Sequence, residues 1–147
     1  EQVFWITIPA SGFYIKPLSA TGRVIITATE ADREINETIF PHELAKLLAE
    51  PPTADELDTD KDGTISLFDL YLTLTRRIAQ SYADQKQLST EHAQLDDNGA
   101  GRATEIQRDY LSEELGGRNK TGTPPPRSPT ADGHLSSQIA VSLKRPE

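Results

Sequence analysis

A twelve-residue segment, Asp58 to Asp69, constrains this chain more than any other part of its sequence. Its residues place oxygen atoms at positions 1, 3, 5, 7, 9 and 12, from which a calcium loop of the EF-hand type binds its ion. Those positions are held by Asp58, Asp60, Asp62, Thr64 through its carbonyl, Ser66 and Asp69. Gly63 at position 6 permits the backbone to reverse, and Ile65 at position 8 supplies an apolar anchor to a core. We therefore predict that this loop binds Ca²⁺.

The last position of the loop departs from the usual pattern, because Asp69 stands where glutamate is usual. An aspartate is shorter, so its backbone must come nearer to the ion before both oxygens can bind. We expect a weaker calcium affinity or a greater tolerance of Mg²⁺. The alternative is a solvated acidic loop, but carboxylates, glycine and apolar anchor in this order favour the ion site. Loops of low affinity suit compartments with millimolar calcium, which favours an extracytoplasmic location.

The segment before the loop favours a structural ion site over a calcium sensor. Pro51 and Pro52 end a helix that is expected over residues 41–50. Thr53 and Glu56 then form the pattern of a capping box and leave room for about one helical turn before the loop. A sensor opens two full helices over a methionine-rich groove, and this sequence contains no methionine.

The segment after the loop predicts a long amphipathic helix. Apolar side chains recur at a spacing of about 3.6 residues from Leu67 to Tyr82. The helix is expected to run from Thr64 to about Leu88, with a continuation as far as Leu95. The apolar stripe of this helix predicts packing in a core and not a groove for a ligand.

A second segment, Asp96 to Gln107, looks like a decayed copy of the first loop. Ala100 replaces the oxygen at position 5, and Gln107 offers no charged group at position 12. The segment starts 38 residues after Asp58, a separation that would suit paired loops. Two interpretations stay open, a second ion site and a plain turn rich in Asp, Asn and Gly.

Composition excludes several classes of function. The net charge of −8 disfavours nucleic acid as a partner, and no stretch is long and apolar enough to span a membrane. The absence of cysteine excludes disulfides, thiolate zinc sites and a cysteine nucleophile in this segment. With 147 residues of which 35% are hydrophobic, the chain can sustain one modest core.

The C-terminal part of the chain has a different composition from the rest. It contains Gly117, Gly122, the run Pro124 to Pro126, and Pro129 among serines and threonines. Such a segment buries too little apolar surface to order itself, so we expect disorder from about residue 117, with residues 135–143 docking as a short element. The predicted organisation is part of a sheet domain over 1–50, a calcium-binding region over 51–107, and a linker with a largely disordered tail over 108–147.

Two short apolar runs near residues 3–8 and 23–29 are rich in β-branched side chains and predict strands. Both are expected to be buried on both faces, as in a parallel sheet. The 14 residues between them provide the crossover that a parallel pair needs, and Pro17 keeps its helix short. Two strands do not form a stable sheet, so further strands are expected upstream. The fold class is therefore α/β, the C-terminal part of a three-layer fold with the calcium loop before its last long helix.

At this point the sequence resembles the second half of bacterial caspase-like and legumain-like (C13-type) peptidase domains. The resemblance rests on three runs over residues 1–107: Pro9-Ala10-Ser11-Gly12-Phe13, the strand Arg23 to Thr29, and Asn36-Glu37-Thr38-Ile39-Phe40. In that family a strand ends in Cys-x-Ser-Gly, a later strand reads close to Val-Val-Ile-Thr-Ala-Thr, and several members carry an acidic loop before the last helix. The resemblance implies a caspase-like parallel sheet.

The same resemblance implies that this chain is a pseudoenzyme. Aligning Ser11 and Gly12 with the Ser-Gly of the family puts Pro9 where the nucleophilic cysteine would stand, and proline has no nucleophile. The histidine base of the family would lie upstream of this chain. A half without either group cannot perform thiol proteolysis.

A serine nucleophile is the remaining catalytic possibility. Ser11 is expected to be exposed by the turn at Gly12, and the available bases are His42, His92 and His134. A serine–histidine pair needs hydrogen-bond reach and a third group that orients the base. None of the three histidines has a spacing that argues for catalysis. We therefore predict no catalytic residues in this segment.

Three interpretations of function remain open. The first is a calcium-binding, catalytically silent α/β module that acts as a scaffold or binding domain. The second is the C-terminal portion of an active peptidase or hydrolase whose catalytic residues lie upstream, so that the partner is the upstream half of the same domain. The third is a calcium-responsive interaction module that exposes a surface to a protein partner.

Overall fold

The computed structural model describes residues 1–143 and divides the chain into two compact units. The first unit comprises Glu1–Thr38, Leu88–Ile106 and Pro126–Ser136. The second comprises Ile39–Gln87, Gln107–Pro125 and Ser137–Glu147. The fold class is mixed α/β, as predicted, with a small three-stranded sheet and several helices. Among the residues described, no helix is long and apolar enough to cross a membrane.

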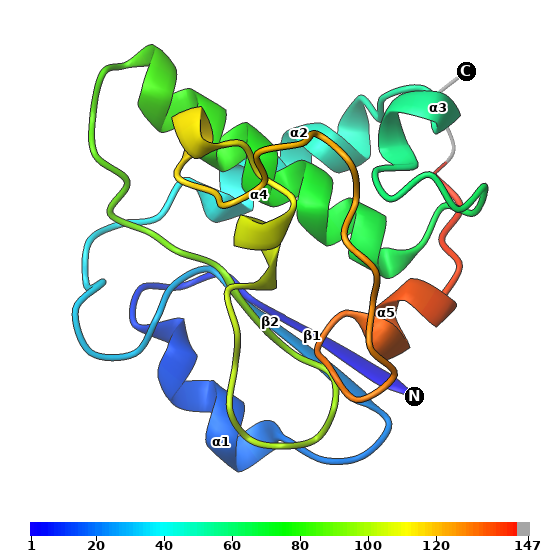
Figure 1. Cartoon of the computed structure of the whole chain (residues 1–147). Coiled ribbons are helices and arrows are strands. Elements are labelled where there is room, and N and C mark those ends of the chain that lie inside the picture. Colours follow the sequence, from blue (N-terminus) through cyan, green and yellow to red (C-terminus); the bar gives the residue numbers. More distant parts are fainter. Residues whose placement is uncertain (144–147) are drawn as a thin grey trace. The chain divides into compact units, whose positions relative to one another are not determined.

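The sheet of the first unit consists of β1 (Gln2–Ile6), β2 (Arg23–Thr27) and β3 (Gln94–Asp96), in that order. Figure 1 shows β1 and β2 side by side. The predicted parallel pair is confirmed, since β1 runs parallel to β2. The sheet is mixed, because β3 lies antiparallel on the other side of β2. The prediction that the long helix continues through Leu95 is therefore wrong. Residues 94–96 are extended and pair with β2.

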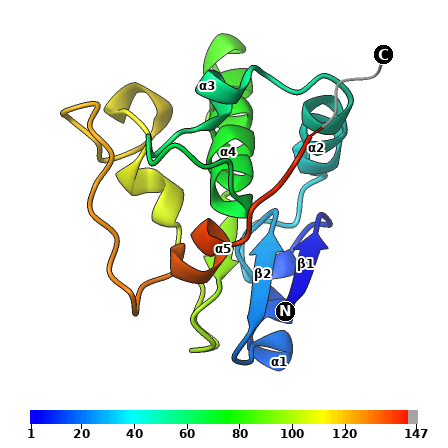
Figure 2. The same cartoon turned by 90° about the vertical axis from the view of Figure 1, so that its right-hand side faces the viewer.

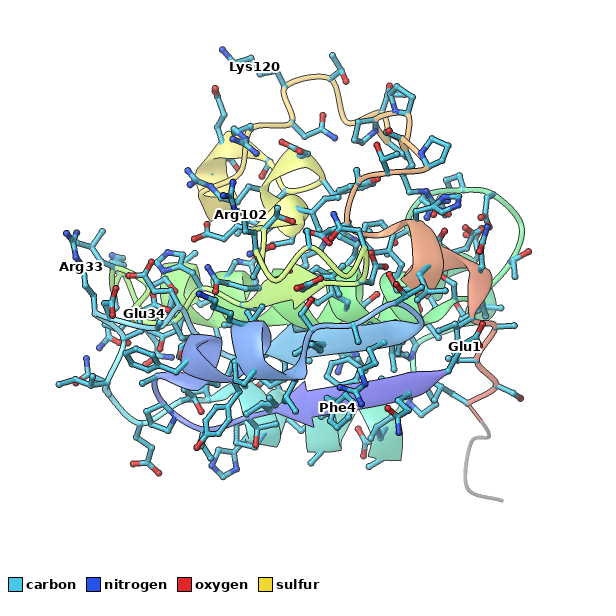
Figure 3. The ribbon with its side chains drawn as sticks, turned by 90° about the horizontal axis from the view of Figure 1, so that it is seen from below. Glu1, Phe4, Arg33, Glu34, Arg102 and Lys120 are labelled. Atoms are coloured by element: carbon cyan, nitrogen blue, oxygen red, sulfur yellow. The ribbon has the colours of Figure 1, made fainter. Side chains whose placement is uncertain are left out.

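The two predicted strands differ in burial. Val24, Ile25 and Ile26 of β2 are fully buried, because β2 has a neighbouring strand on each side. The expected burial of β1 on both faces is wrong. Val3 is exposed, and residues 4–6 of the strand are only half-buried. On this strand the Phe4 ring, labelled in Figure 3, lies 5.8 Å below the Arg23 guanidinium carbon.

The connection from β1 to β2 contains η1 (Ser11–Tyr14) and α1 (Ile15–Leu18). The helix α1 is a single turn, as the prediction from Pro17 required. Ile15 is buried and anchors this turn in the first unit. The chain then turns at Gly22, whose φ of 78° favours glycine, and enters β2.

The second unit contains α2 (Phe40–Ala49), α3 (Ala54–Leu57) and α4 (Leu67–Asp84), which Figure 2 shows. The helix predicted over 41–50 agrees with α2 to within one residue. The single turn predicted before the loop is α3, and its capping box between Thr53 and Glu56 is present. The long helix is shorter than predicted, because Ser66 caps its start and Gln85 ends it.

The apolar stripe of α4 packs in a core, as its spacing predicts. Phe68, Tyr71 and Leu74 are fully buried. The Phe68 ring stacks on Tyr71 with centroids 6.2 Å apart and meets Tyr110 edge-on at 5.3 Å. Tyr71 also donates a hydrogen bond to Gln107. These contacts hold Gln107 and Tyr110 against α4 within the second unit.

The C-terminal region contains short helices in the structure. They are η2 (Ile106–Asp109), η3 (Glu113–Leu115) and α5 (His134–Gln138). Residues 139–141, which follow α5, pair with residues 65–67 of the predicted calcium loop through a β-bridge between Ser66 and Ala140. The last residues of the predicted tail, 144–147, lie outside the described part of the chain.

Candidate metal centre

The backbone of the predicted calcium loop reverses at Lys61 and Gly63, whose φ angles are 58° and 85°. The Asp58 carboxylate stabilises this reversal, because its two oxygens accept hydrogen bonds from the amides of Asp62 (3.1 Å) and Gly63 (3.0 Å). A Cβ atom at Gly63 would have nothing within 4 Å. The glycine is therefore required by its φ angle and not by lack of space.

Asp69 closes the loop at its other end. Its Oδ1 accepts hydrogen bonds from the Thr59 amide (2.8 Å) and hydroxyl (2.7 Å). Its Oδ2 accepts from the Ser66 amide (2.9 Å) and hydroxyl (2.7 Å). The Ser66 hydroxyl in turn accepts from the Asp69 amide, which completes the capping box of α4. The fully buried Asp69 thus ties the start of the loop to the start of the helix.

Three of the predicted ligands converge in the folded loop. Carboxylate oxygens of Asp58, Asp60 and Asp69 all lie within 4.8 Å of one another. They occupy positions 1, 3 and 12 of the loop pattern. Asp58 and Asp60 are half-buried, and Asp69 is buried. The spacing in the sequence therefore corresponds to a real cluster in space.

The other predicted ligands lie in the loop but outside this group of three. Asp62 is exposed, and its carboxylate accepts a hydrogen bond from the Thr64 amide at 2.8 Å. Thr64 is also exposed. Ser66 is buried, and its hydroxyl is engaged with Asp69 as a helix cap. The calcium-loop pattern did not indicate this capping, but Ser66 followed by Asp69 three residues later is the signal of a capping box and could have shown it.

The donor chemistry of the cluster fits a hard divalent cation. Three carboxylates so close together repel one another, and a cation bound between them relieves that repulsion. The lysine of the loop, Lys61, instead places its ammonium 2.7 Å from the Asp55 carbonyl and 3.6 Å from the Asp55 carboxylate. Oxygen ligands suit Ca²⁺ or Mg²⁺, whereas zinc sites favour nitrogen and sulfur. The residues present therefore fit the predicted ion.

The second loop has a different organisation. Asp96 ends β3 and is buried, and its Oδ1 accepts a hydrogen bond from the Gly99 amide at 3.2 Å. Asn98 accepts one from the Ala100 amide at 2.9 Å. Asp96 belongs to the first unit, whereas Gln107 belongs to the second. In the described chain, three or more potential His, Cys, Asp or Glu ligands come within 4.8 Å of one another only at Asp58, Asp60 and Asp69.

A buried acidic pair in the first unit was not predicted from the sequence. Asp97 accepts hydrogen bonds from the amides of Gly133 (2.9 Å) and Ser136 (2.7 Å). Asp132 accepts from the Asp97 amide (3.0 Å) and the Thr104 hydroxyl (2.8 Å). Together these bonds attach residues 132–136 to the end of the sheet. Residues so far apart in sequence carry no local signal of such pairing.

Burial has the largest effect on the ionisation of Asp132. Burial raises the pKa of Asp132 above its ordinary value, and the nearby carboxylates of Asp97 and Asp96 raise it further. The hydrogen bonds from Asp97 and Thr104 partly oppose this change, because they favour the ionised form. Asp132 therefore holds its proton more tightly in the folded protein than in the unfolded chain.

The structure does not support Ser11 as a nucleophile. The expectation that the Gly12 turn exposes Ser11 is wrong, because Ser11 is fully buried. Its hydroxyl accepts a hydrogen bond from the Thr29 amide at 3.1 Å and lies 3.1 Å from the Thr29 hydroxyl. A Cβ atom on Gly12 would lie 2.6 Å from the Ala31 amide nitrogen, so this glycine permits close packing. Pro9 is exposed and carries no reactive group.

One histidine has a carboxylate partner that the sequence did not indicate. Buried Glu34, labelled in Figure 3, contacts Nδ1 of His92 through its Oε1. Its Oε2 accepts hydrogen bonds from the amides of His92 (2.8 Å) and Glu30 (2.9 Å). These bonds fasten the segment after β2 to the segment before β3. The pair therefore has a clear structural role in the first unit.

Comparison with known proteins adds no relative to this description. No family model matches the chain, and neither the curated proteins nor the solved structures gave a match. The caspase-like and legumain-like resemblance therefore stays a prediction that rests on the three runs quoted above. The geometry of the loop from Asp58 to Asp69 is the strongest basis for a functional assignment.

Proposed function

We propose that this chain is a calcium-binding, catalytically silent α/β module with a scaffold or binding role. The observation that carries the proposal is the convergence of the carboxylates of Asp58, Asp60 and Asp69 within 4.8 Å, in a loop with EF-hand spacing. A chance acidic surface would not be expected to combine this convergence with the glycine reversal and the helix cap at the end of the loop.

The three converging carboxylates would hold the ion at loop positions 1, 3 and 12. By their spacing, Asp62, the Thr64 carbonyl and Ser66 are the candidates for the remaining positions. A bound ion supplies positive charge that offsets the repulsion among the carboxylates. The chain's own contribution is to fix the loop between α3 and α4 through the bonds of Asp58 and Asp69.

Catalytic silence is supported by the segment that follows β1. Pro9 takes the place of the nucleophile in the proposed caspase-like alignment, and Ser11 is buried against Thr29. The three-layer caspase-like architecture is part of the same proposal and goes beyond the three-stranded mixed sheet. On this reading the protein keeps the framework of a peptidase domain and uses it for binding.

Calorimetric titration of calcium into the full chain tests the proposal. We expect one ion to bind, and we expect Asp58→Asn or Asp60→Asn to weaken binding at least about tenfold, because each removes a charged ligand. Asp55→Asn is the matched control, since Asp55 is exposed and lies outside the loop. The Asp55→Asn variant should bind calcium with the affinity of the unchanged protein.

Two outcomes would contradict the proposal. One is the absence of calcium binding by a chain that circular dichroism shows to be folded. The other is an equal calcium affinity of the unchanged chain and the three variants, which would show that the ion does not bind at Asp58 and Asp60. A parallel titration with Mg²⁺ measures how far the shorter Asp69 relaxes the selectivity of the loop.

A further inference from the structure

Residues 139–141 act as a strand partner for the middle of the predicted calcium loop. The Leu67 amide donates to the Ile139 carbonyl at 2.8 Å, and the Val141 amide donates to the Ile65 carbonyl at 3.0 Å. Between these two bonds, Ser66 and Ala140 form an antiparallel bridge. All of these residues belong to the second unit. The loop is therefore paired with a segment more than seventy residues away in the chain.

The pairing segment has the burial pattern of a strand. Ile139, Val141 and Leu143 are half-buried, whereas the intervening Ala140 and Ser142 are exposed. Alternation with a period of two places the apolar side chains on one face of an extended segment. The segment therefore docks through both its backbone and its apolar face, and we call residues 139–143 the tail strand.

The tail strand holds the part of the loop from which ligands project. Ile65 and Ser66 stand at positions 8 and 9, directly after the Thr64 carbonyl at position 7. The hydroxyl and amide of Ser66 also hold the Asp69 carboxylate. Pairing of Ile65 and Leu67 with the tail strand thus fixes the backbone on which two of the six ligand positions depend.

Ordering this backbone in advance removes part of the entropy loss that ion binding would otherwise include. Binding of the ion would, in the same way, hold the backbone of residues 65–67 in the conformation that receives the tail strand. Each event then favours the other, and thermodynamic linkage requires the two effects to be equal in magnitude.

We propose that docking of the tail strand and occupation of the calcium loop are coupled, so that calcium controls whether residues 139–143 stay paired with residues 65–67 of the same unit. This inference rests on the proposed function, because it assigns a regulatory consequence to the same ion site. The coupled element is the two-bond ladder between residues 65–67 and 139–141.

Hydrogen exchange of the full chain tests the coupling with the tail strand unaltered. Saturating calcium should slow exchange of the Val141 and Leu67 amides by about fivefold or more, the lower range of typical coupling between two sites. Asp58→Asn should abolish the slowing. Calcium binding that leaves Val141 exchange unchanged would overturn the coupling while leaving the proposed ion site intact.

The reciprocal measurement uses a proline to remove one bond of the ladder. Val141→Pro deletes the amide that donates to Ile65, and we expect calcium affinity to fall by the same factor of about five. Ala140→Pro is the matched control, because the two ladder bonds use the Ile139 carbonyl and the Val141 amide and leave the Ala140 amide out. A proline there also favours an extended residue before it.

The outcomes separate the two proposals. Equal calcium affinity in Val141→Pro, Ala140→Pro and the unchanged chain would overturn the coupling alone. No calcium binding by the folded, unchanged chain would overturn the proposed function and the coupling with it. A fall in affinity confined to Val141→Pro, matched by the exchange result, would support both.

Discussion

Asp69 combines two roles, and this combination gives a physical reason for aspartate at the last loop position. Its two oxygens each accept two hydrogen bonds, from Thr59 and from Ser66. A calcium ion bound through both oxygens would have to share them with those four donors. The weaker affinity expected from the shorter side chain thus has a second cause, which only the folded loop reveals. Capping of α4 and closure of the loop depend on the same carboxylate.

The raised pKa of Asp132 predicts how stability depends on pH. Because the folded state binds this proton more tightly, the resulting stability is present at acidic pH and is lost as the pH rises through the folded-state pKa. We expect Asp132→Asn to remove this pH-dependent stability. Between the ordinary aspartate pKa of 3.8 and neutral pH, the free energy of unfolding of the variant should therefore fall less than that of the unchanged chain. Urea unfolding over that range measures the difference.

The fluorescence of Trp5 is a suitable probe for this experiment, because Trp5 is the single tryptophan and lies on β1 of the first unit. Asp32→Asn serves as control, since Asp32 is exposed and belongs to the same unit. Identical pH profiles for Asp132→Asn and the unchanged chain would show that Asp132 does not carry this dependence.

At the scale of elements, the start of α4 depends on its capping box. Ser66→Ala removes a hydroxyl that accepts from the Asp69 amide and donates to the Asp69 carboxylate. We expect a loss of about 1–2 kcal/mol in the free energy of unfolding, because the cap is buried and its polar partners lose hydrogen bonds. Urea unfolding followed by far-ultraviolet circular dichroism, in chelator, measures this loss.

The helix α3 provides the comparison for that substitution. Its capping box has the same chemistry, but Thr53 and Glu56 are both exposed. Thr53→Ala should therefore cost about 0.5 kcal/mol, at the low end of the range for caps. Equal losses in the two variants would show that burial of the Ser66 cap adds nothing to its strength.

The strand β3 shows how tertiary contacts override a local helical pattern. The sequence predicted that the long helix would continue as far as Leu95, but α4 ends at Asp84. Leu95 instead pairs with Ile26 of β2 and also exchanges two backbone hydrogen bonds with Thr104. The edge of β2 that faces away from β1 pairs with residues 94–96, and no local sequence signal records that this edge is available.

At the scale of the whole molecule, the proposed ion site links calcium concentration to stability. At free calcium one hundred times the dissociation constant, binding to the folded state alone should raise the free energy of unfolding by about 2.7 kcal/mol. Chelator should remove this gain, and Asp58→Asn should show little of it. Urea unfolding in both solutions, followed by circular dichroism, measures the helices α2 and α4 of the second unit. An unchanged transition in calcium would contradict a structural role for the ion.

The sequence by itself determined the features that depend on local spacing. The positions of Asp58, Asp60 and Asp69 in one loop, the glycine reversal at Gly63, and the helices α2 and α4 all follow from short-range geometry. Covalent geometry fixes how far apart neighbouring residues lie along a loop or a helix face. A pattern of residues within one loop or helix can therefore be predicted from the sequence without knowledge of the tertiary structure.

Only the tertiary structure decided which distant segments meet. It placed Asp97 against Asp132, buried Ser11 against Thr29, and paired the predicted calcium loop with the tail strand. These contacts join residues whose separation in the chain says nothing about their distance in space. Their partners are selected by burial of apolar surface and by backbone groups that remain to be paired after the local elements have formed.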